Sequence, residues 1–403
     1  MINLSLKTIK ELEQQYGNPL YIFNPSEFIE NYHEIEDTFR KIYPNYRICY
    51  SYKTNYTPAI CALVKDLGGY AEVVSDMEYE LALKLGYEPK RIVYNGPEKG
   101  HYLESHILNH GITNIDRIEE VARICELAKK YPEEVLSVGI RLNYEIDAGY
   151  VSRFGIDISE FRNTISLLMA SGIRIAGLHC HMSRARGLKQ WERRASTMIE
   201  LVDNYQLFDI DYISLGSGMA GHMDDELKAQ FPYVPSYKEY ADVVFSKFAE
   251  FYKDKKNKPI LFTEPGTTLI SKYIDFVAKV EGIKHIRDKQ FVLLNCSFHN
   301  LGETSQMKNL PIRIFHNGGE KAILTESTFV GYTCLEQDIM FRGFTGELAI
   351  GDYIVFGNVG GYSIVDKPPF ILPNCPMIAY ENNKTSLIKR KESFSDIFRS
   401  FEF

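Results

Sequence analysis

Apolar and polar positions alternate along the chain in two different rhythms, and the first extends to about residue 270. Short apolar segments rich in β-branched residues are followed, in most cases, by stretches with apolar residues at helical spacing. The eight segments are Tyr46–Lys53, Tyr70–Ser75, Arg91–Asn95, Ile112–Ile115, Leu136–Asn143, Ile175–His181, Tyr212–Ser217 and Pro259–Glu264. Strands alternating with helices predict a parallel sheet. Eight such units in roughly 220 residues favour a closed (β/α)8 barrel of the TIM type, with an open doubly wound sheet as the alternative.

Past about residue 270 the rhythm changes to strand-like runs separated by turns. These runs are Tyr273–Val280, Phe291–Asn295, Ile312–Phe315, Ala322–Leu324, Tyr353–Phe356, Met377–Tyr380 and Ser386–Lys389. They predict a second, mainly antiparallel β domain. We therefore expect a barrel over residues 24–270 and a β domain over residues 271–403. We expect residues 1–23, with a short helix and the strand Pro19–Phe23, to form an N-terminal segment associated with the β domain.

Composition narrows the class of protein. Of the 403 residues, 45% are hydrophobic and 25% charged, which is typical of a globular protein. The net charge of −7 and the lack of a basic run argue against nucleic acid or a membrane surface as a partner. The seven cysteines are scattered without a CxxC pair, which favours free thiols. No signal-peptide pattern or membrane-spanning apolar run is present. We expect a cytoplasmic protein.

Candidate chemistry lies at the carboxyl ends of the predicted strands, where parallel barrels carry their reactive groups. These ends hold Lys53, Glu72, Asn95, Asn143, His179 with His181, Gly216–Gly218 and Glu264–Gly266. They contain no Ser/His/Asp order and no Walker loop. Lys53 ends an apolar strand, so we expect it at the barrel mouth, where partial desolvation favours a neutral, nucleophilic amine. An ordinary strand-end lysine in solvent is the alternative.

Two glycine turns follow strands, Gly216-Ser217-Gly218 and Glu264-Pro265-Gly266. Glycine lets the backbone approach an anion closely, and exposed N–H groups can hold a phosphate. Tight turns without a ligand are the alternative interpretation. Glu264 is an ordinary rim carboxylate unless a pyridine nitrogen lies beside it, in which case it would keep that nitrogen protonated.

His179 and His181 flank Cys180, so their side chains face the same side of a strand. Three interpretations stay open: a metal site, core packing, or stacking of a ring on a cofactor. The other strand ends supply no third set of metal ligands, and we predict no metal. Cys334 lies in the β domain, where a lone cysteine is most often a small buried side chain.

The order of the motifs resembles that of the fold-type III pyridoxal-phosphate decarboxylases, the diaminopimelate/ornithine/arginine decarboxylase family. The matching motifs are Tyr52-Lys53-Thr54-Asn55, Glu72–Ser75 with Glu78, Ser152–Gly155, His179–His181, Leu215–Gly218, Glu264–Gly266, Cys334 with Asp338, Gly351-Asp352 and Gly360–Tyr362. Each is short, and their joint order over nearly the whole chain carries the resemblance. It implies a barrel with an alanine-racemase-like β domain, pyridoxal 5′-phosphate as cofactor, and an amino-acid decarboxylase.

The resemblance also implies roles in holding the cofactor ring. Lys53 would bind the cofactor as an imine, and Glu72 stands where the family has an aspartate near the cofactor. His181 would stack on the pyridine ring, and Glu264 would pair with its nitrogen.

Further implied roles concern the phosphate and the assembly. Gly218, Gly266 and Tyr362 would hold the phosphate. Cys334 would reach into the partner subunit's site and donate a proton to the substrate carbon. The implied assembly is a homodimer with shared active sites, to which residues 1–23 and the β domain contribute.

Several positions depart from the family pattern. Ser183-Arg184 replaces Gly-Ser after the second histidine, and Ser217 replaces the middle glycine of a triplet. Thr267 stands where the diaminopimelate enzymes have an arginine directly after Glu-Pro-Gly. Leu335 stands where the family has an acidic residue directly after the cysteine.

These departures bear on the substrate. Thr267 and Leu335 leave a distal zwitterion with fewer charge partners, and a missing buried partner costs several kcal/mol. Arg184 and Arg186 could supply a new anion contact, and Glu336 could replace the lost acidic residue. We expect a substrate that is a modified or carrier-linked amino acid in a specialised biosynthetic pathway. The alternatives are a true diaminopimelate decarboxylase of lysine synthesis, an amino-acid racemase, or an inactive regulatory homologue.

Overall fold

The computed structural model describes residues 1–403, which divide into two compact units. Unit 1 consists of residues 1–31, 222–233 and 269–403. Unit 2 consists of residues 32–221 and 234–268. Unit 1 therefore includes residues 222–233, a segment that lies inside the range expected for the barrel.

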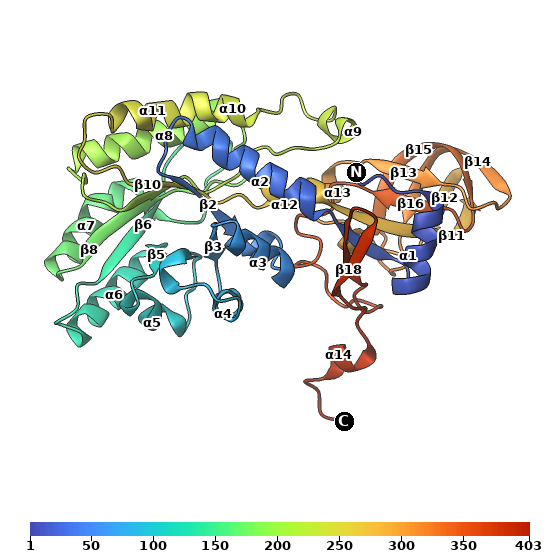
Figure 1. The fold of residues 1–403 in the computed structure, drawn as a ribbon, viewed down its shortest axis with the longest axis horizontal. Helices are drawn as coiled ribbons and strands as arrows, with labels where there is room; N and C mark the ends of the chain where they lie inside the picture. Colours follow the sequence, from blue (N-terminus) through green and yellow to red (C-terminus); the bar gives the residue numbers. More distant parts are fainter. The chain divides into compact units, whose positions relative to one another are not determined.

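Unit 2 contains a closed barrel of eight parallel strands, which confirms the predicted fold class (Figure 1). In order around the ring, the strands are β2 (Tyr46–Ser51), β3 (Tyr70–Val73), β4 (Ile92–Tyr94), β5 (Ile112–Ile115), β6 (Ser137–Asn143), β8 (Arg174–His179), β9 (Tyr212–Ser214) and β10 (Ile260–Thr263). The pairing of β10 with β2 closes the ring, so the open-sheet alternative is wrong. The short strand β7 (Ile156–Asp157) pairs with β6 outside the ring.

Helices connect most of the barrel strands and lie around them (Figure 1). They are α2 (Pro25–Arg40), α3 (Pro58–Asp66), α4 (Asp76–Lys84), α5 (Tyr102–Leu108), α6 (Ile118–Lys130), α7 (Phe161–Ala170), α8 (Leu188–Asn204), α10 (Tyr237–Tyr240) and α11 (Ser246–Phe251). Local signals start several of them. Pro58 occupies the first turn of α3, and the Ser75 hydroxyl caps α4 by accepting a hydrogen bond from the Glu78 N–H.

Side chains fill the barrel interior. Buried residues from five strands meet there, namely Cys49, Val93, Ala176, Tyr212 and Phe262. A packed interior leaves no channel through the barrel, so polar groups gather beyond the strand ends.

Unit 1 contains a mixed, mainly antiparallel sheet. Its strands are β1 (Leu20–Phe23), β11 (Ile274–Ile286), β12 (Lys289–Leu294), β13 (Ile312–Phe315), β14 (Lys321–Val330), β15 (Ile339–Ala349), β16 (Tyr353–Phe356), β17 (Met377–Glu381) and β18 (Lys384–Lys389). Only the pairs β1–β17 and β12–β14 are parallel. The N-terminal strand β1 lies between β11 and β17, so the start of the chain is part of this sheet.

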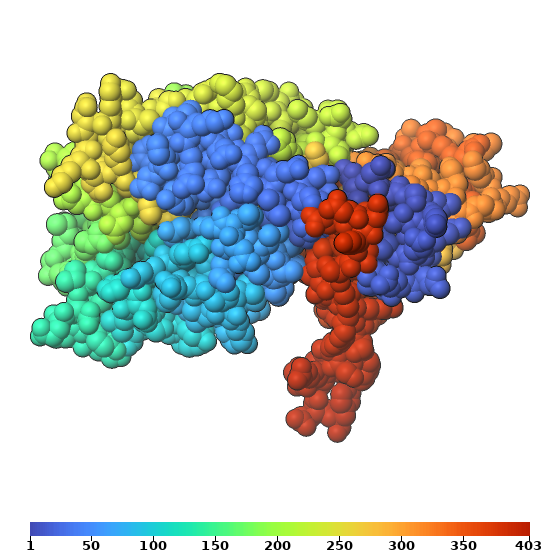
Figure 2. Space-filling view, viewed as in Figure 1, coloured from blue at the N-terminus to red at the C-terminus, as the bar shows by residue number.

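The helices of unit 1 are short apart from α1 (Leu6–Tyr16). The others are α9 (Asp225–Lys228), α13 (Thr304–Met307) and α14 (Phe394–Phe398). Both α2 and α12 (Thr267–Ile270) have residues in each of the two units. One side of α1 joins the apolar core of the sheet through Ile9 and Leu12, which meet Ile22 and Val355. Figure 2 shows the C-terminal segment with α14, coloured red, standing off the rest of unit 1.

The strand β15 was not predicted from the sequence. It contains Gly343 and Gly346, both with positive φ, and its pairing with β14 shifts register three times. Glycines and bulges break the alternation of apolar and polar residues by which strands are recognised. No helix of either unit combines the length and apolar character needed to cross a membrane.

Candidate active site

Lys53 lies in a single helical turn, Tyr52–Thr54, that begins where β2 ends. Its ammonium pairs with Glu72 Oε2 at the end of β3. The Lys53 side chain is 29% exposed, whereas Glu72 is 1% exposed. The amine is therefore reachable from the barrel mouth while its carboxylate partner is not.

Glu72 is held by two further donors. Ser51 Oγ donates to Oε2 at 2.5 Å, and Asn95 Nδ2 donates to Oε1 at 3.3 Å. Asn95 in turn accepts from Asn114 Nδ2 at 2.8 Å. This chain of amides fixes the orientation of the carboxylate without adding charge.

Glu264 is a second buried carboxylate, at the end of β10. It accepts from Ser214 Oγ at 2.8 Å and from Asn95 Nδ2 at 3.1 Å, and His179 Nε2 lies 3.0 Å from it. Burial raises the pKa of Glu264, but the charge and hydrogen bond of His179 and the charge of Lys53 outweigh burial. They hold this pKa well below its usual range. Glu264 is therefore ionised although it is fully enclosed.

His181 follows β8 on the same side as His179, and its Nδ1 lies 3.8 Å from Glu264. Burial, assisted by the charges of Lys53 and Arg141, lowers the pKa of His181 well below its usual range. The Ser217 N–H donates to Nδ1 at 3.2 Å, which identifies Nδ1 as an acceptor. The ring is thus neutral and oriented. No group of three or more His, Cys, Asp or Glu side chains is arranged to hold a metal.

The two glycine turns are neighbours, because the Glu264 N–H donates to the Gly216 carbonyl at 2.8 Å. Gly218 has φ +93°, and a Cβ there would lie 2.9 Å from the Met182 carbonyl. A Cβ on Gly266 would lie 2.0 Å from Thr54 Oγ1. Both positions therefore require glycine.

The turns also present unused donors. The N–H groups of Gly218, Met219, Gly266 and Thr267 form no hydrogen bonds within the chain. Consecutive free N–H groups at a turn and at a helix start form a site suited to an anion.

Several side chains of the site were not singled out from the sequence. Ser51 and Ser214 donate to the two carboxylates, and Arg141 pairs with Asp116 at 2.8 Å while donating to the His181 carbonyl at 3.4 Å. Ser51 and Ser214 are the last residues of their strands, which is the signal that could have identified them. Asn143, in contrast, holds the following loop through the carbonyls of Ser152 and Phe154.

The remaining predicted residues lie elsewhere in the structure. Arg184 is exposed in the loop after β8, with φ +61°. In unit 1, Cys334 is the one exposed cysteine, next to half-buried Leu335 and exposed Glu336. Tyr362 is half-buried, with φ +58°.

Asp338 organises the turn that carries Cys334. Its carboxylate accepts from the Thr333 N–H at 3.0 Å and from the Phe298 N–H at 2.8 Å. This turn therefore has a defined shape although the thiol is exposed.

The groups at the barrel mouth fit the chemistry of pyridoxal 5′-phosphate. Lys53 offers an amine to an aldehyde, Glu264 offers an ionised carboxylate to a pyridine nitrogen, and the glycine turns offer N–H donors to a phosphate. A neutral His181 suits the face of an aromatic ring.

Comparison with known proteins agrees with this fit. The diaminopimelate decarboxylase of Aquifex aeolicus is 26% identical over 97% of this chain and 93% of its own length. That of Methanocaldococcus jannaschii is 24% identical over 96% and 92%.

Solved structures show the same fold. The M. jannaschii diaminopimelate decarboxylase in complex with L-lysine has a TM-score of 0.84 at 23% identity, covering 98% of this chain and 94% of the other. The lysine decarboxylase of Selenomonas ruminantium has a TM-score of 0.78 at 22% identity, covering 94% and 97%.

The family model described as the pyridoxal-binding domain of pyridoxal-dependent decarboxylases matches residues 29–271, which is more than half of the chain and includes the whole barrel. The protein therefore belongs to the pyridoxal-dependent decarboxylases.

Proposed function

We propose that this decarboxylase acts on an amino acid whose distal end is modified or attached to a carrier. The observation that carries the proposal is the absence of charge at two positions, Thr267 and Leu335. Thr267 directly follows the Glu264–Gly266 turn, and Leu335 directly follows Cys334. Uncharged side chains at these two positions would disfavour a free distal ammonium or zwitterion and would accept an amide or ester.

Four residues would hold the cofactor ring and its aldehyde. When bound, pyridoxal 5′-phosphate supplies an electrophilic carbon and a ring that accepts the electron pair left by carbon dioxide. Lys53 would bind the aldehyde carbon, and Glu72, its ion-pair partner, would orient the Lys53 amine near the cofactor. Glu264 would keep a proton at the ring nitrogen, and neutral His181 would cover one ring face without competing for that proton.

The phosphate would lie at the turns of Gly218 and Gly266, with Tyr362 as a further contact. Gly218 and Gly266 have free N–H groups, and neither turn tolerates a side chain at its glycine. Tight fixing of the phosphate orients the ring against Glu264.

Cys334 would return a proton to the substrate carbon after decarboxylation. Its exposure in unit 1 suits a residue that completes the site of another subunit. We therefore include a homodimer with shared active sites in the proposal, and we place the enzyme in the cytoplasm, where its seven free cysteines stay reduced.

Purified, cofactor-loaded enzyme supplied with meso-diaminopimelate, ornithine, lysine and arginine tests the substrate proposal. We expect slow carbon dioxide release from all four, and faster release from derivatives whose distal amine is acylated. Rapid release from meso-diaminopimelate would overturn the proposal.

The competing function is diaminopimelate decarboxylation, and the observation in its favour is that the curated relatives above carry that name. The double variant Thr267→Arg/Leu335→Glu separates the two. If the natural substrate lacks distal charges, this variant should gain activity on meso-diaminopimelate by about tenfold or more, because each restored charge pair contributes 1 kcal/mol or more, as an order of magnitude. A loss of diaminopimelate activity in the variant would favour the competing function.

A further inference from the structure

Arg194 on α8 is fully buried and has no acidic partner. Its Nη1 donates to the carbonyls of Leu215 at 2.7 Å and Ser217 at 3.0 Å, and its Nη2 donates to the Met182 carbonyl at 3.3 Å. Its Nε has no hydrogen-bond partner. Arginine stays protonated in proteins, so a full positive charge is enclosed without a counter-ion.

Enclosed charges without a partner are costly, and proteins normally pair them. The side chains around Arg194 cannot supply a negative charge. Burial raises the pKa of the Cys180 thiol, and it raises that of the Tyr144 hydroxyl further, so both groups are neutral. Trp191, whose ring lies 4.3 Å from the guanidinium carbon, offers only its π face. Within the chain, the charge of Arg194 is therefore met only by carbonyl oxygens and the face of a ring.

One hydrogen bond of Arg194 leads to the turn at which the phosphate is proposed to lie. Ser217 O and the N–H of Gly218 belong to the same peptide group, and this N–H is one of the unused donors of the turn. A cation bound to the carbonyl polarises the peptide and strengthens its N–H as a donor. Arg194 thus acts on one of the peptides whose N–H would contact the phosphate, and it does so through the carbonyl oxygen of that peptide.

Two departures from the family pattern change the charge around the glycine turns. Thr267 replaces a family arginine beside the cradle, and Arg184 replaces the serine after the second histidine. The first change removes a positive charge next to the turns, whereas the second adds one in an exposed loop. The buried guanidinium of Arg194 supplies a positive charge at the Ser217–Gly218 peptide.

We propose that Arg194 is a positioning residue whose charge balances the cofactor phosphate as a dianion through the Ser217–Gly218 peptide. This inference rests on the proposed placement of the phosphate at Gly218 and Gly266. It adds to that placement the source of the positive charge and the ionisation state of the phosphate.

Three variants of the full-length protein test the role of the Arg194 charge. Pyridoxal 5′-phosphate affinity, followed by absorbance, should fall about 10- to 100-fold in Arg194→Gln and Arg194→Met, the range for losing a charged hydrogen-bond partner. Arg194→Lys should recover most of the affinity. Arg174→Met is the matched control, because Arg174 lies on β8 in an exposed pair with Asp211 and should leave affinity unchanged.

Two further measurements distinguish the loss of the Arg194 charge from a general loss of folding. The affinity for pyridoxal, which lacks the phosphate, should be equal in wild type and Arg194→Gln. The phosphorus resonance of the bound cofactor should titrate at higher pH in Arg194→Gln, because the dianion loses its cation. An equal loss for pyridoxal, or an unchanged phosphorus titration, would overturn the inference. Cofactor affinity is measured without substrate. A negative result for Arg194 is therefore distinct from a negative result for the proposed substrate.

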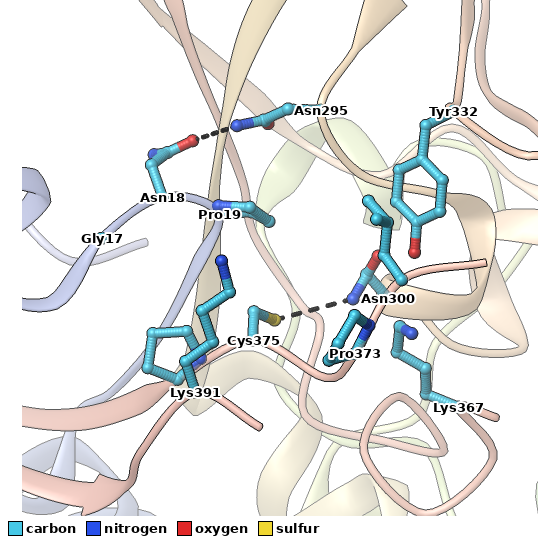
Figure 3. A pocket seen from close by; sticks show the side chains of 12 residues that line it. Gly17, Asn18, Pro19, Asn295, Asn300, Tyr332, Lys367, Pro373, Cys375 and Lys391 are labelled. Carbon is cyan, nitrogen blue, oxygen red and sulfur yellow. Dashed lines mark hydrogen bonds between the residues drawn. The ribbon is translucent and has the colours of Figure 1, made fainter. Parts of the chain in front are cut away.

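A cavity in unit 1 carries a second, independent inference. It has a volume of about 110 Å³ and is lined by residues from the start of the chain, from the β12–α13 region, from the turn after β14 and from the C-terminal segment (Figure 3). Lys367, only 7% exposed, lines it, and the Lys367 ammonium donates only to the Pro368 carbonyl at 3.0 Å. The nearby Glu392 is already bound to Lys389 and Asn374.

Other groups at this cavity favour a negative ligand. Figure 3 shows the Lys391 amine directed toward the space between Pro19 and Cys375, with the Lys367 amine and the Tyr332 hydroxyl on the other side. Lys391 has no acidic partner either. Burial raises the pKa of Cys375 to about 12, so its thiol supplies no charge. Two ammonium groups and a hydroxyl donor thus face a cavity that contains no carboxylate.

The geometry points to a binding site for a small oxyanion, either free phosphate or a carboxylate. Thermal melting of cofactor-loaded enzyme, in which the cofactor site is filled, tests it at constant ionic strength. Phosphate or acetate should raise the melting temperature of wild type relative to chloride, and the better of the two identifies the ligand type.

Lys367→Met should weaken this binding about tenfold or more. Lys391→Gln, a surface change that leaves the fold intact, should weaken it less. An equal response in Lys367→Met and wild type, or no response in wild type, would exclude the site.

Discussion

At the scale of single residues, the barrel mouth contains two buried carboxylates with different neighbours. Glu72 faces the Lys53 ammonium and neutral donors, whereas Glu264 is in contact with His179 and two further donors. In the proposed function, the first would hold the amine in position at the barrel mouth. The second keeps its negative charge in an enclosed position, which is the property that a pyridinium nitrogen requires.

Glu264→Gln tests the second role. The amide keeps the shape and can still accept from Ser214, but it cannot hold a proton at a ring nitrogen. We expect the decarboxylation rate to fall about 100- to 1,000-fold, as for the loss of one preorganised electrostatic partner, while cofactor binding persists. Single-turnover carbon dioxide release and absorbance titration measure the two effects. Equal decarboxylation rates in wild type and Glu264→Gln would contradict the proposed role of Glu264.

Glu78 provides a pH prediction at the same scale. Burial raises its pKa to about 7, so the folded state binds a proton that the unfolded state lacks between pH 4.5 and 7. Its contribution to stability is therefore greatest at low pH and falls as the pH rises through 7. Glu78→Gln, which can still accept from the Val74 N–H, should be more stable than wild type at pH 8, by about 1–3 kcal/mol.

Chemical denaturation at pH 5 and pH 8 checks this difference. At pH 5 the two proteins should be nearly equally stable. Glu80→Gln is the control on the same helix, since Glu80 is exposed and pairs only with Lys84. A stability gap between wild type and Glu78→Gln that does not change with pH would disprove the raised pKa.

At the scale of elements, the site depends on how tightly the turns after β9 and β10 pack on their neighbours. Gly218→Ala places a Cβ 2.9 Å from the Met182 carbonyl in a left-handed backbone, so we expect a loss of both stability and cofactor affinity. Gly172→Ala is the control. Gly172 also has positive φ, +74°, but lies before β8, with no atom within 4 Å of the added Cβ.

Thermal melting and cofactor titration separate the two glycine variants. Both should lose about 1 kcal/mol of stability from backbone strain. Only Gly218→Ala should bind cofactor more weakly. If both variants bound cofactor equally well, the turn at Gly218 would not form the phosphate site.

The strands also show which parts of the structure could be predicted from the sequence. The eight barrel strands are short apolar runs between helices, so local pattern sufficed, and their last residues pointed to Lys53, Glu72 and Glu264. The strand β15 was missed because its glycines interrupt the alternation. Arg194 was missed for another reason: its partners, Leu215 and Ser217, lie more than 20 positions away, and no local pattern reveals a buried charge without a counter-ion.

At the scale of the whole molecule, the residues proposed for one reaction lie in separate units. Lys53 and Glu264 belong to unit 2, whereas Cys334 and Tyr362 belong to unit 1. In the proposed homodimer, Cys334 of one chain would serve the Lys53 of its partner. This arrangement makes a prediction that does not depend on the identity of the substrate.

Lys53→Ala and Cys334→Ser should each be nearly inactive alone. When the two variants are unfolded together and refolded, about half of the dimers should contain one copy of each. In such a dimer one site combines an intact Lys53 with an intact Cys334, while the other site lacks both. Carbon dioxide release should therefore recover to about a quarter of the wild-type rate. If Cys334 served its own chain, every site in the mixture would lack one of the two groups, and the mixture would stay inactive although mixed dimers had formed.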